Sequence, residues 1–295
     1  LLEQRVAERT NELENAKHQA EDAVKVKTDF LSNMSHEIRT PISNVINMSK
    51  MVLDTELNNR QRDYLEKIQV SGRMLLELVD DVLDYSHLET GKLHLDSAPI
   101  DVVNMIDSVV SLYADKVSAK NLKLNVDIDQ RMELSLIGDG MRLKQMLCNY
   151  VSNAVKFSEK GNITIRVFVV AGGAADVLVR FEVRDEGVGI APSLQKKLFA
   201  AFQQADMSLR RKFGGSGLGL AINRRLSAMM GGEVGFESQS GKGSTFWFTA
   251  KLARADTHEV QEEQPETARR PMVEQRLQGV SVLLVEDDHF NQQVV

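Results

Sequence analysis

The chain has 295 residues, of which 42% are hydrophobic, 26% are charged and only 5% are aromatic, an ordinary composition for a soluble protein of about two domains. Its formal net charge of -6 argues against binding to nucleic acid, which favours proteins with a basic face. The single cysteine, Cys148, excludes a framework of disulfides, and the six histidines lack the spacing of metal ligands.

No apolar stretch of the sequence approaches membrane-spanning length, and no signal peptide is apparent. The chain begins at Leu1 without a methionine and ends inside an apolar, strand-like run. We therefore expect a cytoplasmic fragment of a longer protein. Any membrane anchor of that protein would lie in a region N-terminal to this chain.

Apolar residues at helical spacing predict one long helix over residues 1–53, which contain a single proline and no glycine. Its two halves follow heptad registers that join only through one extra step of four, between about Ala16 and Ile38. This pattern is typical of a stutter, a local unwinding of a coiled coil, and an imperfect seam explains it equally well. On the second register His36 lies opposite the seam, so we expect it to face solvent.

A second amphipathic helix is expected after the polar break at residues 54–59. It runs to about Glu89, with Gly91 as its C-cap. The two helices form an antiparallel hairpin, which cannot bury its apolar faces alone. A homodimeric four-helix bundle, formed by the hairpins of two chains, is the economical solution.

From Lys92 the pattern changes to mixed strands and helices, which predicts a two-layer α/β sandwich over residues 92–252 and an α+β fold for the chain. Gly172 and Gly173 predict a hairpin turn between two strands. Residues 253–279 are polar and aperiodic, which predicts a linker. Residues 280–295 follow it and start with the pattern of a buried strand. The expected strands are 93–95, 122–128, 163–170, 177–184, 233–238 and 245–252, and the expected helices are 102–120, 141–157 and 217–230.

The helix expected at residues 141–157 carries several polar groups near one face. Asn149 and Asn153 lie one turn apart, Lys156 lies three residues further, and Phe157 follows. Amide oxygens are hard ligands suited to Mg²⁺, and a lysine supplies positive charge to phosphates. For this segment alone, a solvated polar helix face is the simpler interpretation.

Two glycine-containing loops follow. The first loop comes directly after an expected strand, and its glycines would let the backbone approach a ligand. Its aspartate can accept a hydrogen bond from an exocyclic amine such as that of adenine. An acidic turn is the alternative interpretation. The second opens an expected helix and offers backbone N–H groups and a helix N-terminus to phosphates. The loops contain Asp185, Gly187 and Gly189, and Gly215, Gly217, Leu218 and Gly219, respectively.

A basic stretch precedes the second loop and has little secondary-structure signal. It predicts either a mobile lid that brings positive charge to the phosphates or an exposed basic loop. Residues 241–245 predict a turn between strands, structural by default, with a nucleotide contact by Thr245 as the alternative. The basic residues are Arg210, Arg211 and Lys212.

The order and spacing of these motifs resemble the ATP-binding domain of sensor histidine kinases, which is related to gyrase-type ATPases. The hairpin over residues 28–91 resembles their dimerisation and phosphoacceptor domain, with residues 30–37 as its H box. The resemblance covers about residues 25–252 and includes Phe199–Phe202 as the F box. The helix over residues 1–27 is similar to the signalling coiled coil that precedes many such kinases. Glu286 and Asp287 resemble the acidic pair of a receiver domain, as in hybrid kinases.

The resemblance implies that the imidazole of His36 attacks ATP, while Glu37 fixes its tautomer and acts as base. Asn153, with Asn149, would hold Mg²⁺ against the phosphates, and Asp185 would bind adenine. Where the water-hydrolysing relatives have a glutamate, this chain has Asn149, and an amide cannot act as a base. ATP should therefore be spent on histidine rather than on water.

Thr40 follows His36 by one helical turn. In relatives with Glu-x-x-Thr this position orients a water that dephosphorylates a response regulator, which predicts a second, phosphatase activity. An N-cap-like residue before Pro41 is the alternative.

The implied partners are a receiver domain of the same protein, a separate response regulator or a phosphotransfer protein. Two other functions compete with the kinase: an ATP-binding signalling scaffold, disfavoured by the intact motifs, and a gyrase-like ATPase, disfavoured by Asn149 and the hairpin.

Overall fold

The computed structural model describes residues 2–91, 93–129, 132, 135–173, 175–201 and 216–255, with the side chains of the first helix described only in part before residue 33. The chain divides into two units, one formed by residues 1–40 and 73–255 and the other containing residues 41–72. The predicted receiver-like segment, the basic lid stretch and nearly all of the linker lie outside the described residues.

Both long helices predicted from periodicity are confirmed, as α1 (Leu2–Leu53) and α2 (Asn59–Glu89). The polar break between them ends in a reciprocal cap at the start of α2. The side-chain oxygen of Asn58 accepts from the Gln61 N–H at 2.9 Å, and the Gln61 side chain accepts from the Asn58 N–H at 2.9 Å. This capping box satisfies two helix-end donors and fixes where α2 begins. The stutter concerns side chains that are described only in part, and it stays a prediction.

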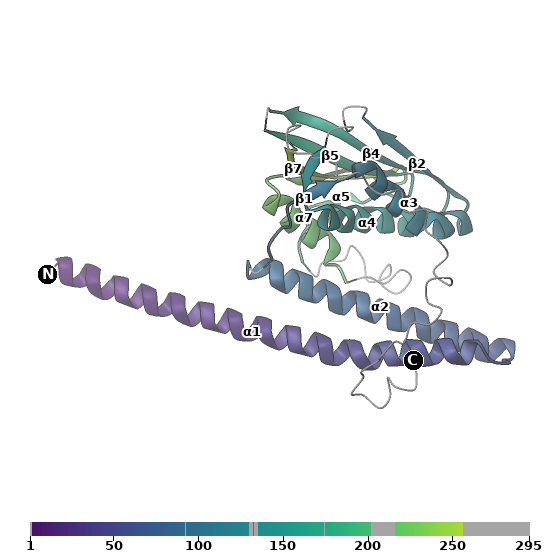
Figure 1. The fold of residues 1–295 in the computed structure, drawn as a ribbon, viewed down its shortest axis with the longest axis horizontal. Coiled ribbons are helices and arrows are strands. Elements are labelled where there is room, and N and C mark those ends of the chain that lie inside the picture. Colours follow the sequence, from purple (N-terminus) through teal and green to yellow (C-terminus); the bar gives the residue numbers. More distant parts are fainter. Residues whose placement is uncertain are drawn as a thin grey trace, which may run out of the picture. The chain divides into compact units, whose positions relative to one another are not determined.

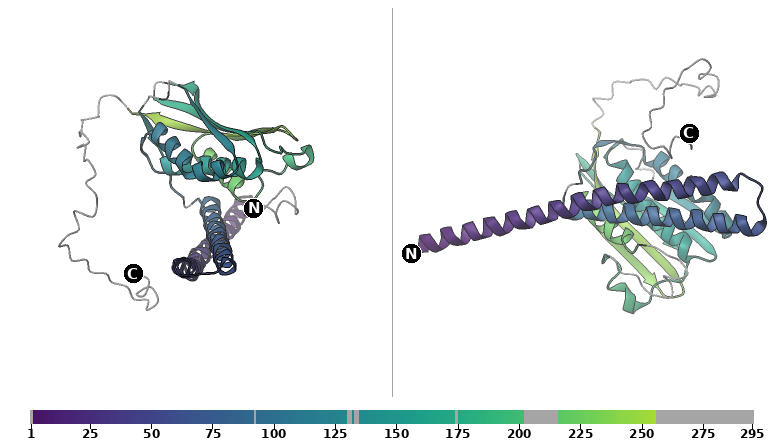
Figure 2. Two further views of the ribbon diagram at one scale, coloured as in Figure 1. Left: turned by 90° about the vertical axis from the view of Figure 1, so that its right-hand side faces the viewer. Right: turned by 90° about the horizontal axis from the view of Figure 1, so that it is seen from below.

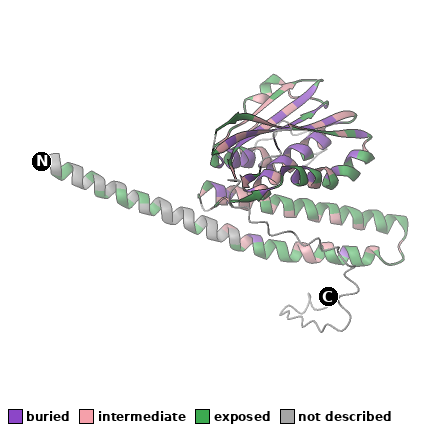
Figure 3. Cartoon of the chain, turned by 45° about the horizontal axis from the view of Figure 1, so that its top comes forward, coloured by how far each residue is buried: buried purple, intermediate pink, exposed green. Residues whose placement is uncertain are grey.

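Apolar side chains of the hairpin segment 41–72 remain exposed to solvent. They occur on both helices, and Figure 3 shows the exposed residues dominating these stretches. Within this segment the two helices pack closely, because a Cβ on Gly72 would lie 2.8 Å from Cγ1 of Ile46. The hairpin therefore buries one stripe between its helices and leaves another uncovered. The exposed apolar residues are Val45, Met48, Met51, Val52, Tyr64, Ile68 and Val70.

The expected α/β sandwich is one mixed sheet with helices α3, α4 and α7 on one of its faces (Figures 1 and 2). The strand order is β1-β3-β7-β5-β4-β2, with β6 also paired to β7. Among the strands that the structure describes, only β2 and β4 pair in parallel. Strands β4 and β5 form the hairpin predicted at the double glycine. The strands are β1 (Ala98–Ile100), β2 (Leu122–Ile128), β3 (Leu136–Gly138), β4 (Gly161–Gly172), β5 (Asp176–Asp185), β6 (Val234–Gln239) and β7 (Gly243–Arg254). The helices are α3 (Val102–Ala119), α4 (Gly140–Phe157), the short α5 (Pro192–Gln195) and α7 (Gly219–Met229).

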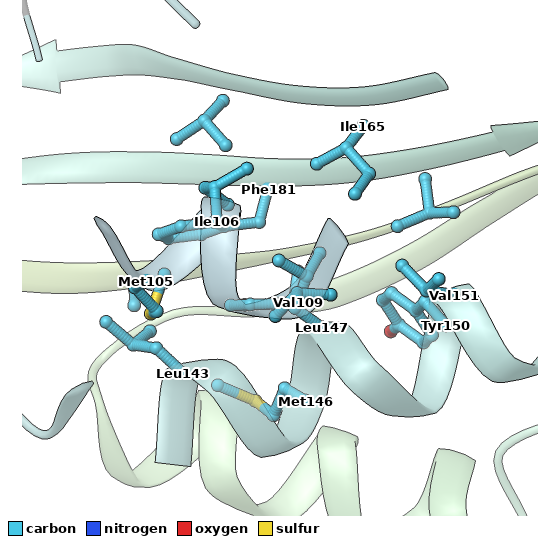
Figure 4. Packing of buried hydrophobic residues seen from close by; sticks show 14 of the residues in the cluster. Met105, Ile106, Val109, Leu143, Met146, Leu147, Tyr150, Val151, Ile165 and Phe181 are labelled. Atoms are coloured by element: carbon cyan, nitrogen blue, oxygen red, sulfur yellow. The ribbon is translucent and has the colours of Figure 1, made fainter. Parts of the chain in front are cut away.

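The core lies between this sheet and its helices, and Figure 4 shows α3 and α4 contributing most of the labelled side chains. Phe181 of β5 and Phe248 of β7 stack at 4.8 Å between ring centroids in the same layer. The strand expected at residues 93–95 is absent; Leu93 and Leu95 instead pack against this core in a non-strand conformation. Because α4 buries its apolar stripe here, its polar face turns away from the sheet.

Candidate functional site

Helix α4, which carries the predicted asparagines, is held at both ends by side chains. At its start Asp139 accepts a hydrogen bond from the Arg142 N–H at 2.9 Å, a normal N-cap. At its end the ammonium group of Lys120 donates to the carbonyl oxygens of Val155, Lys156 and Ser158 at 2.6, 3.2 and 3.2 Å. Terminal carbonyls of a helix have no intrahelical partner and carry partial negative charge, so this lysine stabilises the end of α4.

We expect Lys120→Met to lower the free energy of unfolding by about 1 to 2 kcal/mol, because three terminal carbonyls lose a charged donor. Nucleotide affinity should fall as well, since the end of α4 holds the lysine and phenylalanine of the motif. Urea unfolding and nucleotide titration measure the two effects. The matched control is Lys123→Met, an exposed lysine on β2, which should change neither. Equal stability of the two variants would contradict the capping role.

Asp185, at the end of β5, is buried with 7% of its surface exposed. One carboxylate oxygen accepts from the Gly187 N–H at 2.8 Å, and the residue pairs with Ser244 of β7 in the sheet register. Burial raises the pKa of Asp185 above its ordinary value, and the hydrogen bonds from the backbone of Gly187 and Ser244 oppose this rise. A buried carboxylate with unused acceptor capacity fits an N–H donor of a ligand.

Three segments meet at this carboxylate, and backbone hydrogen bonds join them. The Val188 N–H donates to the Phe157 carbonyl at the end of α4 at 3.3 Å, and the Val188 carbonyl accepts from Gly241 in the β6–β7 turn at 2.8 Å. Gly189, the next residue after Val188, has φ +63°. It lies so close to the β6–β7 turn that a Cβ on it would be 2.1 Å from the Gln239 carbonyl oxygen. The glycines of the first loop thus allow close packing of backbone segments.

The structure does not bring Thr245 to this site, which corrects the interpretation of Thr245 as a nucleotide contact. Side chains alternate along a strand, so Ser244 lies beside Asp185 while Thr245 lies on the opposite face of β7. There it lines an open cavity of about 560 Å³ with charged residues of the uncovered sheet face, among them Arg184 and Glu237. Ser244, which is 7% exposed, is the residue that the sequence reasoning missed.

The second glycine loop leads into α7. Gly217 has φ +72°, Leu218 is fully buried as the residue before the helix, and α7 begins at Gly219. Ser216 accepts from the Leu218 N–H at 3.1 Å and donates to the carboxylate of Asp81 on α2. Burial raises the pKa of Asp81. Gly215, Arg210, Arg211, Lys212 and Phe202 lie outside the described residues.

The polar face of α4 meets α7 at Asn149. Its side-chain NH₂ donates to the side-chain oxygen of Asn223 at 2.9 Å and lies 3.4 Å from the Gly219 carbonyl oxygen. Asn153 and Lys156 follow on the same face and are half-buried. The ammonium of Lys156 lies 5.0 Å from the ring centroid of Phe157, and burial lowers its pKa. The ring of Phe199 packs on that of Phe236, with 6.0 Å between the ring centroids, beside the hydrophobic core.

The predicted phosphoacceptor lies on α1. His36, Glu37 and Thr40 are all exposed, as the heptad register predicts for His36. The hydroxyl of Thr40 donates to the His36 carbonyl at 3.2 Å, within a helix that continues through Pro41. The N-cap interpretation of Thr40 is therefore wrong, because α1 does not begin there.

Taken together, α4, the loop after β5 and the start of α7 supply amide oxygens, an ammonium group, a buried carboxylate and a helix N-terminus. Among the described residues no group of three or more His, Cys, Asp or Glu side chains could hold a metal ion. The amide oxygens of Asn149 and Asn153 are hard donors that fit a Mg²⁺ ion bound together with an anionic ligand. The residues present fit a Mg²⁺-nucleotide.

Two stretches of the chain match the models of known protein families. Residues 26–91 match the family model described as "His Kinase A (phospho-acceptor) domain", and residues 138–254 match "Histidine kinase-, DNA gyrase B-, and HSP90-like ATPase". The chain belongs to the sensor histidine kinases. The chain is 45% identical over 241 residues to the signal transduction histidine-protein kinase BarA of Escherichia coli (strain K12), and 41% identical over 243 residues to the sensor histidine kinase GacS of Pseudomonas protegens.

Each of these two alignments covers 82% of the chain and 26% of the relative, so the chain spans about a quarter of the length of these relatives. Among solved structures, full-length ShkA in complex with AMPPNP superposes with a TM-score of 0.65 at 37% identity, covering 77% of this chain and 46% of that one. None of the described helices is long and apolar enough to cross a membrane.

Proposed function

We propose that the chain transfers the γ-phosphoryl group of ATP to His36 and from there to an aspartate of a receiver domain. The observation that carries this proposal is the presence, in one chain, of an exposed His36-Glu37 pair on a helix and of a loop after Asp185 that packs against the end of the helix carrying Asn149 and Asn153. The likeness to ShkA, whose structure contains the ATP analogue AMPPNP, supports ATP as the nucleotide.

In this proposal each residue has a defined task. Nε2 of His36 forms the new bond to the γ-phosphorus as the bond to the bridging oxygen breaks and ADP leaves. Glu37 orients the ring through its other nitrogen and takes up the proton. Asp185 accepts a hydrogen bond from the adenine amine. Asn153 and Asn149 hold Mg²⁺, which when bound neutralises charge on the phosphates.

A second copy of the chain is the proposed cover for the exposed apolar stripe of the hairpin. Two hairpins that pair through Val45, Met48, Ile68 and their neighbours would form the four-helix bundle expected from the sequence. Such isologous pairing is the usual form of a dimer interface. His36 faces away from the heptad seam and would stay accessible in this homodimer.

Three kinds of partner follow from the product, a phosphohistidine. A receiver domain of the same protein, a separate response regulator or a phosphotransfer protein would accept its phosphoryl group. We also propose that Thr40, exposed one turn from His36, orients a water molecule when the bound regulator is dephosphorylated. A Thr40→Ala variant that still removes phosphate from the regulator as fast as the parent would overturn this second activity.

The decisive experiment incubates the chain with γ-labelled ATP and Mg²⁺. We expect label that is lost in acid and kept in base, as a phosphoramidate is, and that disappears completely in His36→Gln. The control is His87→Gln on α2, which should retain the label. No label on the parent chain would favour an ATP-binding scaffold, and release of free phosphate without label would favour a gyrase-like ATPase.

A further inference from the structure

One residue outside the motifs stands behind the nucleotide site. Asn223 lies one turn into α7 and is completely buried. Its NH₂ group donates to the Met146 carbonyl oxygen of α4 at 2.9 Å, and its side-chain oxygen accepts from the Asn149 NH₂ at 2.9 Å. An apolar residue would normally fill such a position between two packed helices, so a buried amide with both ends bonded requires an explanation.

The direction of these hydrogen bonds is fixed at one end. The Met146 carbonyl can only accept, so Asn223 must turn its NH₂ toward it and its oxygen toward Asn149. Asn149 must then present its own NH₂ to Asn223, where the Gly219 carbonyl also lies within 3.4 Å. The one remaining polar atom of Asn149, its Oδ1, is left for the ligand side.

We infer that Asn223 is a positioning residue, which fixes the side-chain amide of Asn149 so that Oδ1 and not NH₂ serves the Mg²⁺-nucleotide. This inference rests on the role of Asn149 in the proposed function. Without Asn223 the amide can turn over and present hydrogen atoms to a cation. Partners behind a metal ligand commonly change metal affinity by about 10- to 100-fold.

The same geometry selects an amide over a carboxylate at position 149. A carboxylate there would direct oxygen atoms at two acceptors, the Asn223 side-chain oxygen and the Gly219 carbonyl. Neither could donate to it, so a base able to activate water is disfavoured at this position. The two helices also pack closely at this point, since a Cβ on Gly219 would lie 3.2 Å from Oδ1 of Asn149.

The test compares binding of AMPPNP with Mg²⁺ and with EDTA, by calorimetry, in four proteins: the parent, Asn223→Leu, Asn149→Ala and the double variant. Asn223→Leu should weaken binding about tenfold with Mg²⁺ and leave binding in EDTA nearly unchanged. The double variant should bind no worse than Asn149→Ala, because Asn223 acts through Asn149. The matched control is Ser227→Ala, a buried residue of α7 whose hydroxyl donates to the Thr249 carbonyl at 2.8 Å.

Losses that add in the double variant, or that are equal with Mg²⁺ and with EDTA, would overturn the inference and leave Asn223 a structural residue. Failure of the parent chain to bind AMPPNP would instead overturn the proposed function. If Asn223→Leu does not fold, Asn223→Ser replaces it, since a serine cannot reach both partners. Nitrogen-15 spectra give a second readout: the NH₂ signal of Asn149 should shift in Asn223→Leu and stay in place in Ser227→Ala.

Discussion

Replacing Asp185 by Asn is expected to weaken ATP binding by about 10- to 100-fold while the fold stays at least as stable at neutral pH. The carboxylate is buried at the end of β5, and its unused acceptor capacity is what would bind the adenine amine. An amide offers a weaker acceptor and a donor that the adenine amine cannot use. Calorimetric titration with AMPPNP measures the loss of affinity.

The stability of this variant follows from the sign of the pKa shift. Burial raises the pKa of Asp185 above its ordinary value of 3.8, so the folded chain holds a proton that the unfolded chain releases. The contribution of Asp185 to stability is therefore fully present at pH values below 3.8 and is lost as the pH rises through the raised pKa. The amide of the variant cannot ionise, so the advantage of Asp185→Asn over the parent should grow across that window.

Urea unfolding at a series of pH values from below 4 to neutral tests this trend. The neighbouring Glu186→Gln is the matched control: it removes the same charge from an exposed side chain that accepts from the Asn162 N–H at 2.9 Å. Because hydrogen bonds to Asn162 lower the pKa of Glu186, its replacement should cost stability as the pH rises. An Asp185→Asn protein that binds AMPPNP like the parent, or that unfolds more easily at neutral pH, would contradict the assignment.

Long periodic elements were predictable from the sequence almost to the residue. The strand expected at 122–128 matches β2, and the helix expected at 102–120 ends one residue earlier in α3. Each of these segments contains several helical turns or several alternations of apolar and polar residues, so a single residue that breaks the pattern does not hide its period. The three-residue strands β1 and β3 were missed, because a segment so short has no measurable period and forms only through its neighbours in the sheet.

The candidate site also combines residues that a local sequence pattern indicates with residues that only the tertiary packing brings there. The motif residues that lie near one another in the chain, such as Asn149 and Asn153, were predictable from their spacing. Lys120, which caps a helix end 35 to 38 residues away, and Asn223, 74 residues from Asn149, carry no local signal, because only the packing of α3 and α7 brings them there. Thr245 was placed wrongly because an error of one residue in a strand reverses the face.

Gly189→Ala should be among the most damaging single-methyl changes in the chain, costing about 2 to 5 kcal/mol of unfolding free energy. The backbone at Gly189 has φ +63°, a conformation that costs an alanine about 1 to 2 kcal/mol. The added Cβ would also meet the Gln239 carbonyl oxygen at 2.1 Å, so the β6–β7 turn must move, which adds about 1 to 3 kcal/mol. That turn adjoins Asp185, so nucleotide affinity should fall with stability.

The Gly241→Ala variant separates the cost of the backbone conformation from the cost of the close contact. Gly241 lies in the β6–β7 turn, against which Gly189 packs. Its φ is +79°, yet a Cβ there would meet no atom within 4 Å. Gly241→Ala should therefore cost only the conformational part, about 1 to 2 kcal/mol, and leave AMPPNP affinity nearly unchanged. If the two variants unfold at the same urea concentration, close packing at Gly189 is not what holds the turn, and the loop after β5 must draw its order from elsewhere.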